Sequence, residues 1–221
     1  MSERGRTSPV EPPPSRWDMP TTAPRDDSDI VAIGADLEPG TLLAAYRAGL
    51  FPMPFDRKRI AWFSPDPRGV LPIERFHISR TLARHLKRFT ITIDQAFTDV
   101  MRGCAFQPRS GAWINGDFID AYTTLHQLGW AHSVEVRSVD SGELVGGLYG
   151  VRIGGLFAGE SMFHLQTDGS KAAMVGLVDW LGRTGATLVD LQWTTPHLVS
   201  MGAIDLPRDE YLRQLALAIE S

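Results

Sequence analysis

Apolar residues recur every three to four positions in several stretches of the chain, and this spacing predicts amphipathic helices. In Thr41–Ala48, the threonine can cap a helix start and the following Gly49 can end the helix. The segment Arg80–Phe89 follows Ser79, which is also suited to a helix start. The other helices expected from this pattern are about Gln95–Gly103, Asp117–Leu128, Asp168–Arg183 and Asp209–Ile219.

Strands are expected where polar and apolar residues alternate, or where short apolar runs lie between glycines. His132–Ser138 alternates with period two, and Asp140-Ser141-Gly142 after it is typical of a turn. The expected strands are Trp62–Phe63, Thr90–Asp94, His132–Ser138, Leu144–Ile153, Leu156–Phe163 and Ala186–Trp193. The second half of the chain is therefore expected to run as three antiparallel strands, a helix, a strand and a final helix.

The predicted helix Arg80–Phe89 carries an apolar stripe and a basic stripe on opposite faces. Its apolar stripe is Ile78, Leu82, Leu86 and Phe89, and its basic stripe is Arg80, Arg84, Lys87 and Arg88. From Arg75 to Thr90 there are five Lys or Arg, two His and no Asp or Glu, in a chain whose net charge is −4. Charge alone favours an ordinary solvated helix face, but the absence of interleaved acids keeps the run a candidate phosphate-binding patch.

Composition divides the chain into a tail and two expected domains. Residues 1–28 hold six of the 15 prolines and few aliphatic side chains, so we expect a disordered tail. An N-terminal domain is expected over 29–105 and a second domain over 106–221. Hydrophobic residues at 43% and charged residues at 22% are typical of a globular protein.

Several classes of protein and site are excluded. A single cysteine, Cys104, rules out a disulfide framework and a Cys-rich zinc site. His132, His164 and His197 lack metal-ligand spacing, so we expect no metal. No apolar run approaches the roughly 20 residues that span a bilayer, and the N-terminus lacks the apolar core of a signal peptide. A cytoplasmic protein without membrane contact is expected.

Six glycines lie between Gly146 and Gly159, within the expected strands. No GxGxxG or GxxxxGK[ST] motif is present, so a nucleotide-phosphate loop of those types is not supported. Glycines in strands indicate hairpin turns and bulges, or a close approach of backbone to a ligand. The stretch Gly159–Phe163 lacks the second glycine of a serine-hydrolase GxSxG motif.

Asp190 and Gln192 lie two positions apart in an apolar strand and therefore share one face. A carboxylate there is costly to bury without partners. Either the aspartate bonds nearby loop amides, or the two side chains form an oriented polar pair in a cleft. Trp113 follows a loop and is either a core residue or a stacking platform for a nucleic-acid base.

Further motifs run in order along about Gly34–Leu215. They include Ala45-Tyr46-Arg47, WFSPDPR at 62–68, His77-Ile78-Ser79-Arg80, LHQLGWAHSVEV, ELVGGLYGV, LFAGESMF and DLQ. With these motifs the chain resembles the bacterial leucyl/phenylalanyl-tRNA–protein transferases. The resemblance implies an α+β fold, with a small N-terminal α+β domain followed by an N-acetyltransferase-like mixed α/β domain.

The resemblance also implies an activity. Such enzymes move Leu, Phe or sometimes Met from aminoacyl-tRNA to an N-terminal Arg or Lys of a protein, which then enters N-degron degradation. The ester bond to tRNA is already activated, so no cofactor is expected. The implied partners are aminoacyl-tRNA and proteins or peptides with N-terminal Arg or Lys, and a monomer is expected.

Site residues follow from the same resemblance. Asp190 is expected to orient Gln192, whose carbonyl oxygen accepts a hydrogen bond from the attacking amine, while Glu160 holds the cationic acceptor terminus. Trp113 and Met53 are expected at the 3′-adenosine. The transferred side chain is expected in a pocket of Leu148, Phe157, Gly159, Met174 and Val189. The tRNA phosphates are expected at Arg80, Arg84, Lys87 and Arg88.

One departure and two alternatives stand beside this interpretation. Relatives often carry Phe-Pro-Trp where this chain has Phe51-Pro52-Met53, so one aromatic wall is missing. A small-molecule N-acetyltransferase using acetyl-CoA is the first alternative, and the absence of a Q/R-x-x-G-x-G/A loop argues against it. The second is a catalytically inactive tRNA-binding protein, which the presence of Asp190, Gln192 and Glu160 disfavours.

Overall fold

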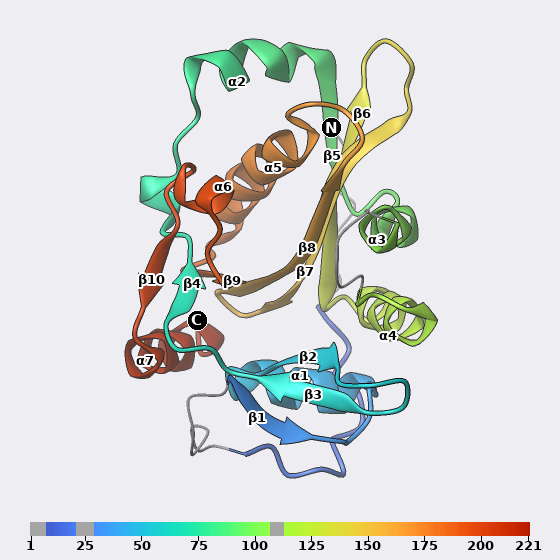
Figure 1. The fold of residues 1–221 in the computed structure, drawn as a ribbon, viewed down its shortest axis with the longest axis vertical. Helices are drawn as coiled ribbons and strands as arrows, with labels where there is room; N and C mark the ends of the chain where they lie inside the picture. Colours follow the sequence, from blue (N-terminus) through green and yellow to red (C-terminus); the bar gives the residue numbers. More distant parts are fainter. Residues whose placement is uncertain (1–7, 21–28, 107–112) are drawn as a thin grey trace.

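The computed structural model describes residues 8–20, 29–106 and 113–221, and these residues form a small sheet and a large sheet (Figure 1). The small sheet has the order β1-β3-β2 and is antiparallel. Its strands are β1 (Ile30–Ile33), β2 (Phe51–Pro54) and β3 (Ile60–Phe63), with α1 (Pro39–Arg47) between β1 and β2. The predicted first helix is thus confirmed, shifted by one or two residues.

The large sheet has seven strands in the order β10-β4-β9-β8-β7-β6-β5. The strands are β4 (Arg68–Val70), β5 (Phe89–Ile93), β6 (Ala131–Ser138), β7 (Leu144–Ile153), β8 (Leu156–His164), β9 (Leu188–Gln192) and β10 (Ile204–Leu206). Only the β8–β9 pair is parallel among the paired strands described. A parallel pair needs a crossover, which α5 (Gly169–Thr184) provides. This mixed α/β order agrees with the succession of three antiparallel strands, a helix, a strand and a helix predicted for the second half of the chain.

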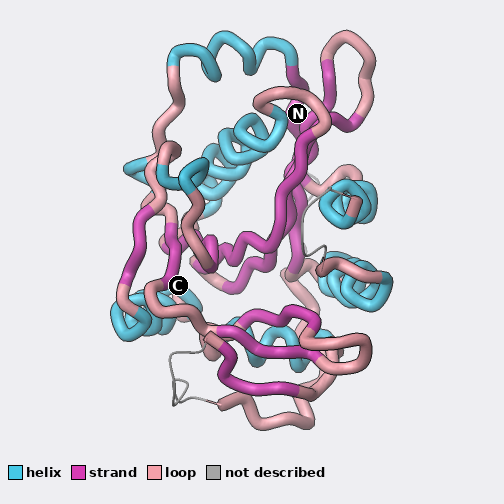
Figure 2. Tube along the Cα trace, viewed as in Figure 1, coloured by secondary structure: helices cyan, strands magenta, loops and turns pink. Residues whose placement is uncertain are grey.

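Helices cover both faces of the large sheet (Figure 2). α5 packs on one face, where its apolar side chains join those of β7, β8 and β9. α3 (Phe97–Ala105) and α4 (Gly116–Gln127) pack on the other face, together with α1. α6 (Pro196–Val199) follows β9, and α7 (Arg208–Ile219) packs near the β4 end of the sheet. Within the described residues, no helix has the length and apolarity needed to cross a membrane.

The two sheets divide between β3 and β4, near residue 65, because β4 and β5 both pair into the large sheet. The division of the chain into domains at 105 stays a prediction. The predicted helix Arg80–Phe89 is α2 (Arg80–His85) with a 3₁₀ turn over Leu86–Arg88, and Phe89 already belongs to β5. The aromatic and β-branched run FTITI favours a strand once β6 is available as a partner.

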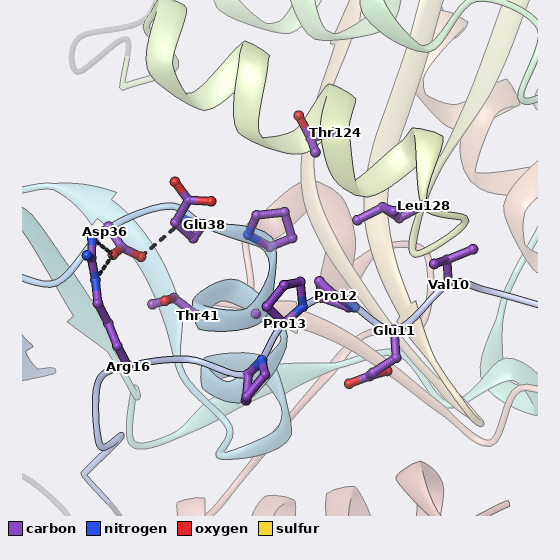
Figure 3. A pocket seen from close by; sticks show the side chains of 13 residues that line it. Val10, Glu11, Pro12, Pro13, Arg16, Asp36, Glu38, Thr41, Thr124 and Leu128 are labelled. Atoms are coloured by element: carbon purple, nitrogen blue, oxygen red, sulfur yellow. Dashed lines mark hydrogen bonds and ion pairs between the residues drawn. The ribbon is translucent and has the colours of Figure 1, made fainter.

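Residues 8–20, which we name the N-terminal strap, correct part of the predicted disorder. The strap lies along α1 and the end of α4 (Figure 3). The Val10 N–H donates to the Leu128 carbonyl at 2.8 Å, and Glu11 pairs with Arg47 at 2.8 Å. Prolines carry no N–H group to satisfy, so a proline-rich segment can be ordered by few main-chain bonds. The rest of the predicted tail, 1–7 and 21–28, lies outside the described residues.

Candidate active site

A cavity of about 490 Å³ opens between β7, β8, α5 and the segment after β9. Most of its wall is apolar, which suits an uncharged ligand group. Its wall includes Trp113, Leu148, Gly159, Glu160, Met162, Met174, Leu177, Leu191, Trp193, His197 and Leu198. The Nε2 atom of His197 is buried without a protein partner among the described residues, and burial lowers the pKa of this imidazole.

Three of the five residues predicted for the side-chain pocket line this cavity, namely Leu148, Gly159 and Met174. Phe157 and Val189 do not line it, because both are fully packed in the core of the α5 face. Trp113 reaches the cavity and packs edge-on against Phe118 with ring centroids 5.3 Å apart.

Met53 is not among the lining residues and packs against the hydrophobic core that includes the apolar residues of α1. Trp193, which the sequence did not single out, lines the cavity instead. Its ring meets Phe51 edge-on with centroids 5.0 Å apart. An aromatic residue therefore stands at the cavity although the Phe-Pro-Trp motif of relatives is absent.

Glu160 supplies a carboxyl group to the cavity wall and is only 8% exposed. The residue lies at a bulge in β8, where the pairing with β7 shifts between Tyr149–Ser161 and Gly150–Gly159. Gln192 donates from Nε2 to Glu160 Oε1 at 2.8 Å, and Tyr122 donates to Oε2 at 3.3 Å. Burial raises the pKa of Glu160 to about 8, so the carboxyl group is poised near neutral pH.

Gln192 ends β9 in a left-handed backbone conformation with φ of 67°. Such a φ is uncommon for a residue other than glycine and persists only where the surroundings hold it. The main-chain N–H of Gln192 donates to Asp190 Oδ1 at 2.8 Å. Asp190 therefore contacts the Gln192 backbone, whereas the side-chain amide is bound by Glu160.

Asp190 is held by a buried network that the sequence did not reveal. Arg68 donates from Nε and Nη2 to the two carboxylate oxygens at 2.8 and 2.6 Å, and both side chains are 1% exposed. Tyr211 donates to the same carboxylate at 2.9 Å. The guanidinium lies between the rings of Phe51 and Tyr211, at 4.8 and 4.4 Å from their centroids.

The structure therefore places the three predicted catalytic residues in layers. Glu160 lines the cavity, and the Gln192 side chain is hydrogen-bonded to Glu160. Asp190 lies behind Gln192, bound to its main chain and paired with Arg68. Arg68 ends the WFSPDPR motif, which was the one signal available in the sequence for its importance. Its partner is 122 positions away, and no local pattern can show such a pairing.

The four predicted phosphate-binding cations lie on α2 and the turn after it. Arg80, Arg84, Lys87 and Arg88 are all exposed and join none of the ion pairs found among the described residues. α2 crosses the end of the large sheet that is remote from the small sheet (Figure 1). The position of α2 is fixed by His85, whose Nδ1 lies 2.7 Å from Asp168 at the start of α5.

The described His, Cys, Asp and Glu residues form no group that could hold a metal ion.

The order of elements and the cavity beside β8 define a mixed α/β protein with a small N-terminal sheet. Residues 35–66 match the family model of the leucyl/phenylalanyl-tRNA protein transferase N-terminal domain. Residues 70–216 match the model of leucyl/phenylalanyl-tRNA protein transferase. The chain belongs to this family of aminoacyltransferases.

Curated relatives agree with the family models. The leucyl/phenylalanyl-tRNA–protein transferase of Tolumonas auensis is 47% identical over 201 residues, which are 89% of this chain and 85% of the relative. That of Syntrophotalea carbinolica is 48% identical over 191 residues, covering 84% and 82%. Among solved structures, FemX has a TM-score of 0.44 at 11% identity, over 80% of this chain and 70% of that one.

Proposed function

We propose that the protein transfers Leu or Phe, and to some extent Met, from aminoacyl-tRNA to the N-terminal Arg or Lys of acceptor proteins. The observation that carries the proposal is an apolar cavity with one carboxyl group, that of Glu160, in its wall. The cavity suits an apolar aminoacyl side chain, and Glu160 suits a cationic acceptor terminus. The transferred residue would mark the acceptor for N-degron degradation.

The chemistry is aminolysis of an ester. The neutral α-amine attacks the carbonyl carbon, the C–N bond forms, and the C–O bond to the tRNA ribose breaks. An α-ammonium group releases one proton before it attacks, and a second proton moves to the leaving ribose oxygen. Because the ester is already activated, the reaction requires no added cofactor. Aminoacyl-tRNA as the substrate makes the cytoplasm the proposed place of action.

The proposed roles follow the layers of the site. Glu160 accepts the Gln192 amide N–H at 2.8 Å, which turns the amide oxygen away from the carboxyl group and toward a donor such as the acceptor amine. Asp190 acts behind it by fixing the end of β9 through the Gln192 main chain. Neutral Gln is a weak base, so its contribution is positioning and electrostatic stabilisation.

The side-chain preference is proposed to come from Leu148, Met174 and Leu177 in the cavity wall. Apolar walls reject charged side chains but discriminate poorly between apolar ones of similar size. The exposed cations of α2 are proposed to contact tRNA phosphates. Such contacts carry little sequence information, so many tRNA bodies would be accepted.

Mass spectrometry tests the proposal directly. The protein is mixed with Leu-tRNA or Phe-tRNA and with peptides beginning with Arg, Lys or Ala. A mass gain of one Leu or Phe on the Arg and Lys peptides, and none on the Ala peptide, is the expected result. No gain on any peptide while tRNA still binds would favour an inactive tRNA-binding protein. Incorporation of an acetyl group from acetyl-CoA would favour a small-molecule acetyltransferase.

A further inference from the structure

We propose that two buried tyrosines, Tyr46 and Tyr122, position Glu160 and, through it, the Gln192 amide for the acceptor amine. This inference rests on the proposed function and assigns it two positioning residues. Tyr46 lies on α1, within the segment that matches the N-terminal family model, and Tyr122 lies on α4. The small N-terminal part of the chain would thereby help to build the active site.

The four side chains form a continuous series of hydrogen bonds from the core to the cavity. The hydroxyl groups of Tyr46 and Tyr122 are hydrogen-bonded to each other. Tyr122 donates to Glu160 Oε2 at 3.3 Å, and Glu160 Oε1 accepts from Gln192 Nε2 at 2.8 Å. Each carboxyl oxygen accepts one of these bonds, and Tyr46 also interacts with the carboxyl group, so the carboxyl plane and the amide are both fixed.

Burial keeps water away from both tyrosine hydroxyl groups and keeps them protonated. Tyr46 is 2% exposed and Tyr122 is 0% exposed, so no bulk water can replace either hydroxyl group. Burial also raises the pKa of both phenols well above their usual value. Both therefore remain neutral O–H donors at any pH at which the protein would work, and both favour the ionised form of Glu160.

Other charged and titratable groups surround Glu160 as well. Asp190 on β9 raises the pKa of Glu160, and Arg68 on β4 lowers it. The phenol of Tyr149 on β7 also lies close enough to interact with the carboxylate. Among all these groups, only the two tyrosines and Gln192 are hydrogen-bonded to the Glu160 carboxyl group within the described residues.

Tyr149 offers a matched control. It is 0% exposed and packs edge-on against the Tyr122 ring with centroids 5.5 Å apart. Its hydroxyl group has no hydrogen-bond partner among the described residues. The Tyr149 ring also lines the cavity, and its replacement by phenylalanine keeps this ring while it removes one phenol oxygen from the same core without removing a bond to Glu160.

The experiment compares Tyr122→Phe, Tyr46→Phe and Tyr149→Phe in the full chain. Transfer of Leu from Leu-tRNA to an Arg-starting peptide is measured from pH 6 to 9.5, with kcat and both KM values. We expect Tyr122→Phe to lower kcat near pH 7.5 by about tenfold, as for one lost bond to a charged group. The KM for aminoacyl-tRNA should stay within about twofold, the size of change left by a contact that the tRNA does not make.

The pH profile separates positioning from packing. Loss of a donor to the carboxylate raises the pKa of Glu160, so the rising limb of kcat should move to higher pH in Tyr122→Phe. Tyr46→Phe should move it in the same direction, because the Tyr46 hydroxyl group also lowers the pKa of Glu160. Tyr149→Phe should leave the midpoint in place.

Each outcome decides the inference. Equal losses in Tyr122→Phe and Tyr149→Phe, with no change in the pH midpoint, would show that the tyrosines only fill space. If Tyr122→Phe does not fold, as judged by its thermal unfolding, Tyr46→Phe carries the test by the same criterion. A wild-type protein that transfers nothing would instead overturn the proposed function, which the first assay reveals before any variant is made.

Discussion

Arg68 and Asp190 carry opposite charges into the interior, where each is 1% exposed. Removing both charges from water is costly, and the cost is offset only by good geometry and by further hydrogen bonds. Arg68 has such bonds to both carboxylate oxygens and donates to the Gly49 carbonyl at 3.1 Å. The pair joins the end of α1, β4 and β9, so it stabilises the site as a whole.

Arg68→Met should therefore destabilise the protein strongly. The change leaves the Asp190 carboxylate buried without its cation, which typically costs about 3–5 kcal/mol of unfolding free energy. The double variant Arg68→Met/Asp190→Leu should recover much of this loss but not the transfer activity, because Gln192 loses its main-chain acceptor. Urea unfolding and the transfer assay measure the two effects.

An exposed ion pair provides the control for this prediction. Arg183 and Asp179 pair at 2.6 Å with exposed fractions of 61% and 65%. Arg183→Met should change the unfolding free energy by less than about 1 kcal/mol, as is usual for surface pairs. If Arg68→Met is no more destabilising than this control, the buried network has little structural role.

The Glu160 carboxyl group is proposed to act in the reaction, yet its burial makes the folded protein less stable when the group is ionised. Its pKa is about 8 in the folded protein against 4.5 as the ordinary value, mainly because burial disfavours the charge. A raised folded pKa means that the stability contribution is present at low pH. The contribution is lost as the pH rises from about 4.5 through about 8.

Glu160→Gln should remove this dependence. The melting temperature of the variant relative to wild type should rise between pH 5 and pH 9, since only the wild type then carries a buried charge. Transfer to Arg-starting peptides should fall at every pH. Thermal unfolding at the two pH values measures the first effect, and a difference that stays constant across this range would contradict the pKa of about 8.

At the scale of elements, the N-terminal strap joins α1 to the end of α4. Val10 bonds to Leu128 through its N–H, and Trp130 Nε1 donates to the Val10 carbonyl at 2.8 Å. Gly40 at the start of α1 lies so close to the strap that an added Cβ atom would approach the Pro13 carbonyl oxygen to 2.0 Å. The strap lies against both helices (Figure 3). The same helices carry Tyr46 and Tyr122, so the strap braces the elements behind Glu160.

Deletion of residues 1–20 should lower the melting temperature by several degrees and reduce kcat. Gly40→Ala in the full chain should have a similar effect, because the new methyl group displaces the strap. In the truncated chain, Gly40→Ala should be neutral or stabilising by up to about 1 kcal/mol, since alanine favours a helix. Equal effects of Gly40→Ala in both chains would contradict this interpretation.

At the scale of the whole molecule, charge is distributed unevenly. The chain has a net charge of −4, yet α2 and the turn after it present exposed cations. The small sheet, with β1, β2 and β3, lies at the opposite end of the molecule from α2 (Figure 1). Association with tRNA should therefore depend on this one end, and it should weaken as salt increases.

Arg84→Ala together with Arg88→Ala should weaken tRNA binding and flatten its salt dependence. Each lost phosphate contact lowers the slope of log affinity against log salt by about 0.9 for a duplex. Arg102→Ala with Arg183→Ala changes the net charge equally and should leave the slope near the wild-type value. The measurement is tRNA affinity across a series of salt concentrations. An unchanged slope in the first pair would remove α2 from the interface.

The sequence by itself determined the longer elements, because local periodicity reports which side of an element is buried. The helices α4, α5 and α7 and the strands β6, β7, β8 and β9 lie within a few residues of their predicted positions. The short strands β1, β2, β4 and β10 were not predicted as such. Strands of three or four residues have too little pattern to be recognised without their partners.

The family and the exposed basic residues of α2 were also accessible from the sequence, since both rest on local motifs, and the family resemblance made Asp190, Gln192 and Glu160 predicted site residues. Only the tertiary structure decided which groups meet. It paired Arg68 with Asp190, bound the Gln192 amide to Glu160 and set Tyr46 and Tyr122 behind them. Long-range pairing depends on how separate elements pack, and packing minimises the cost of burying polar groups over the whole chain, which no local pattern of residues records.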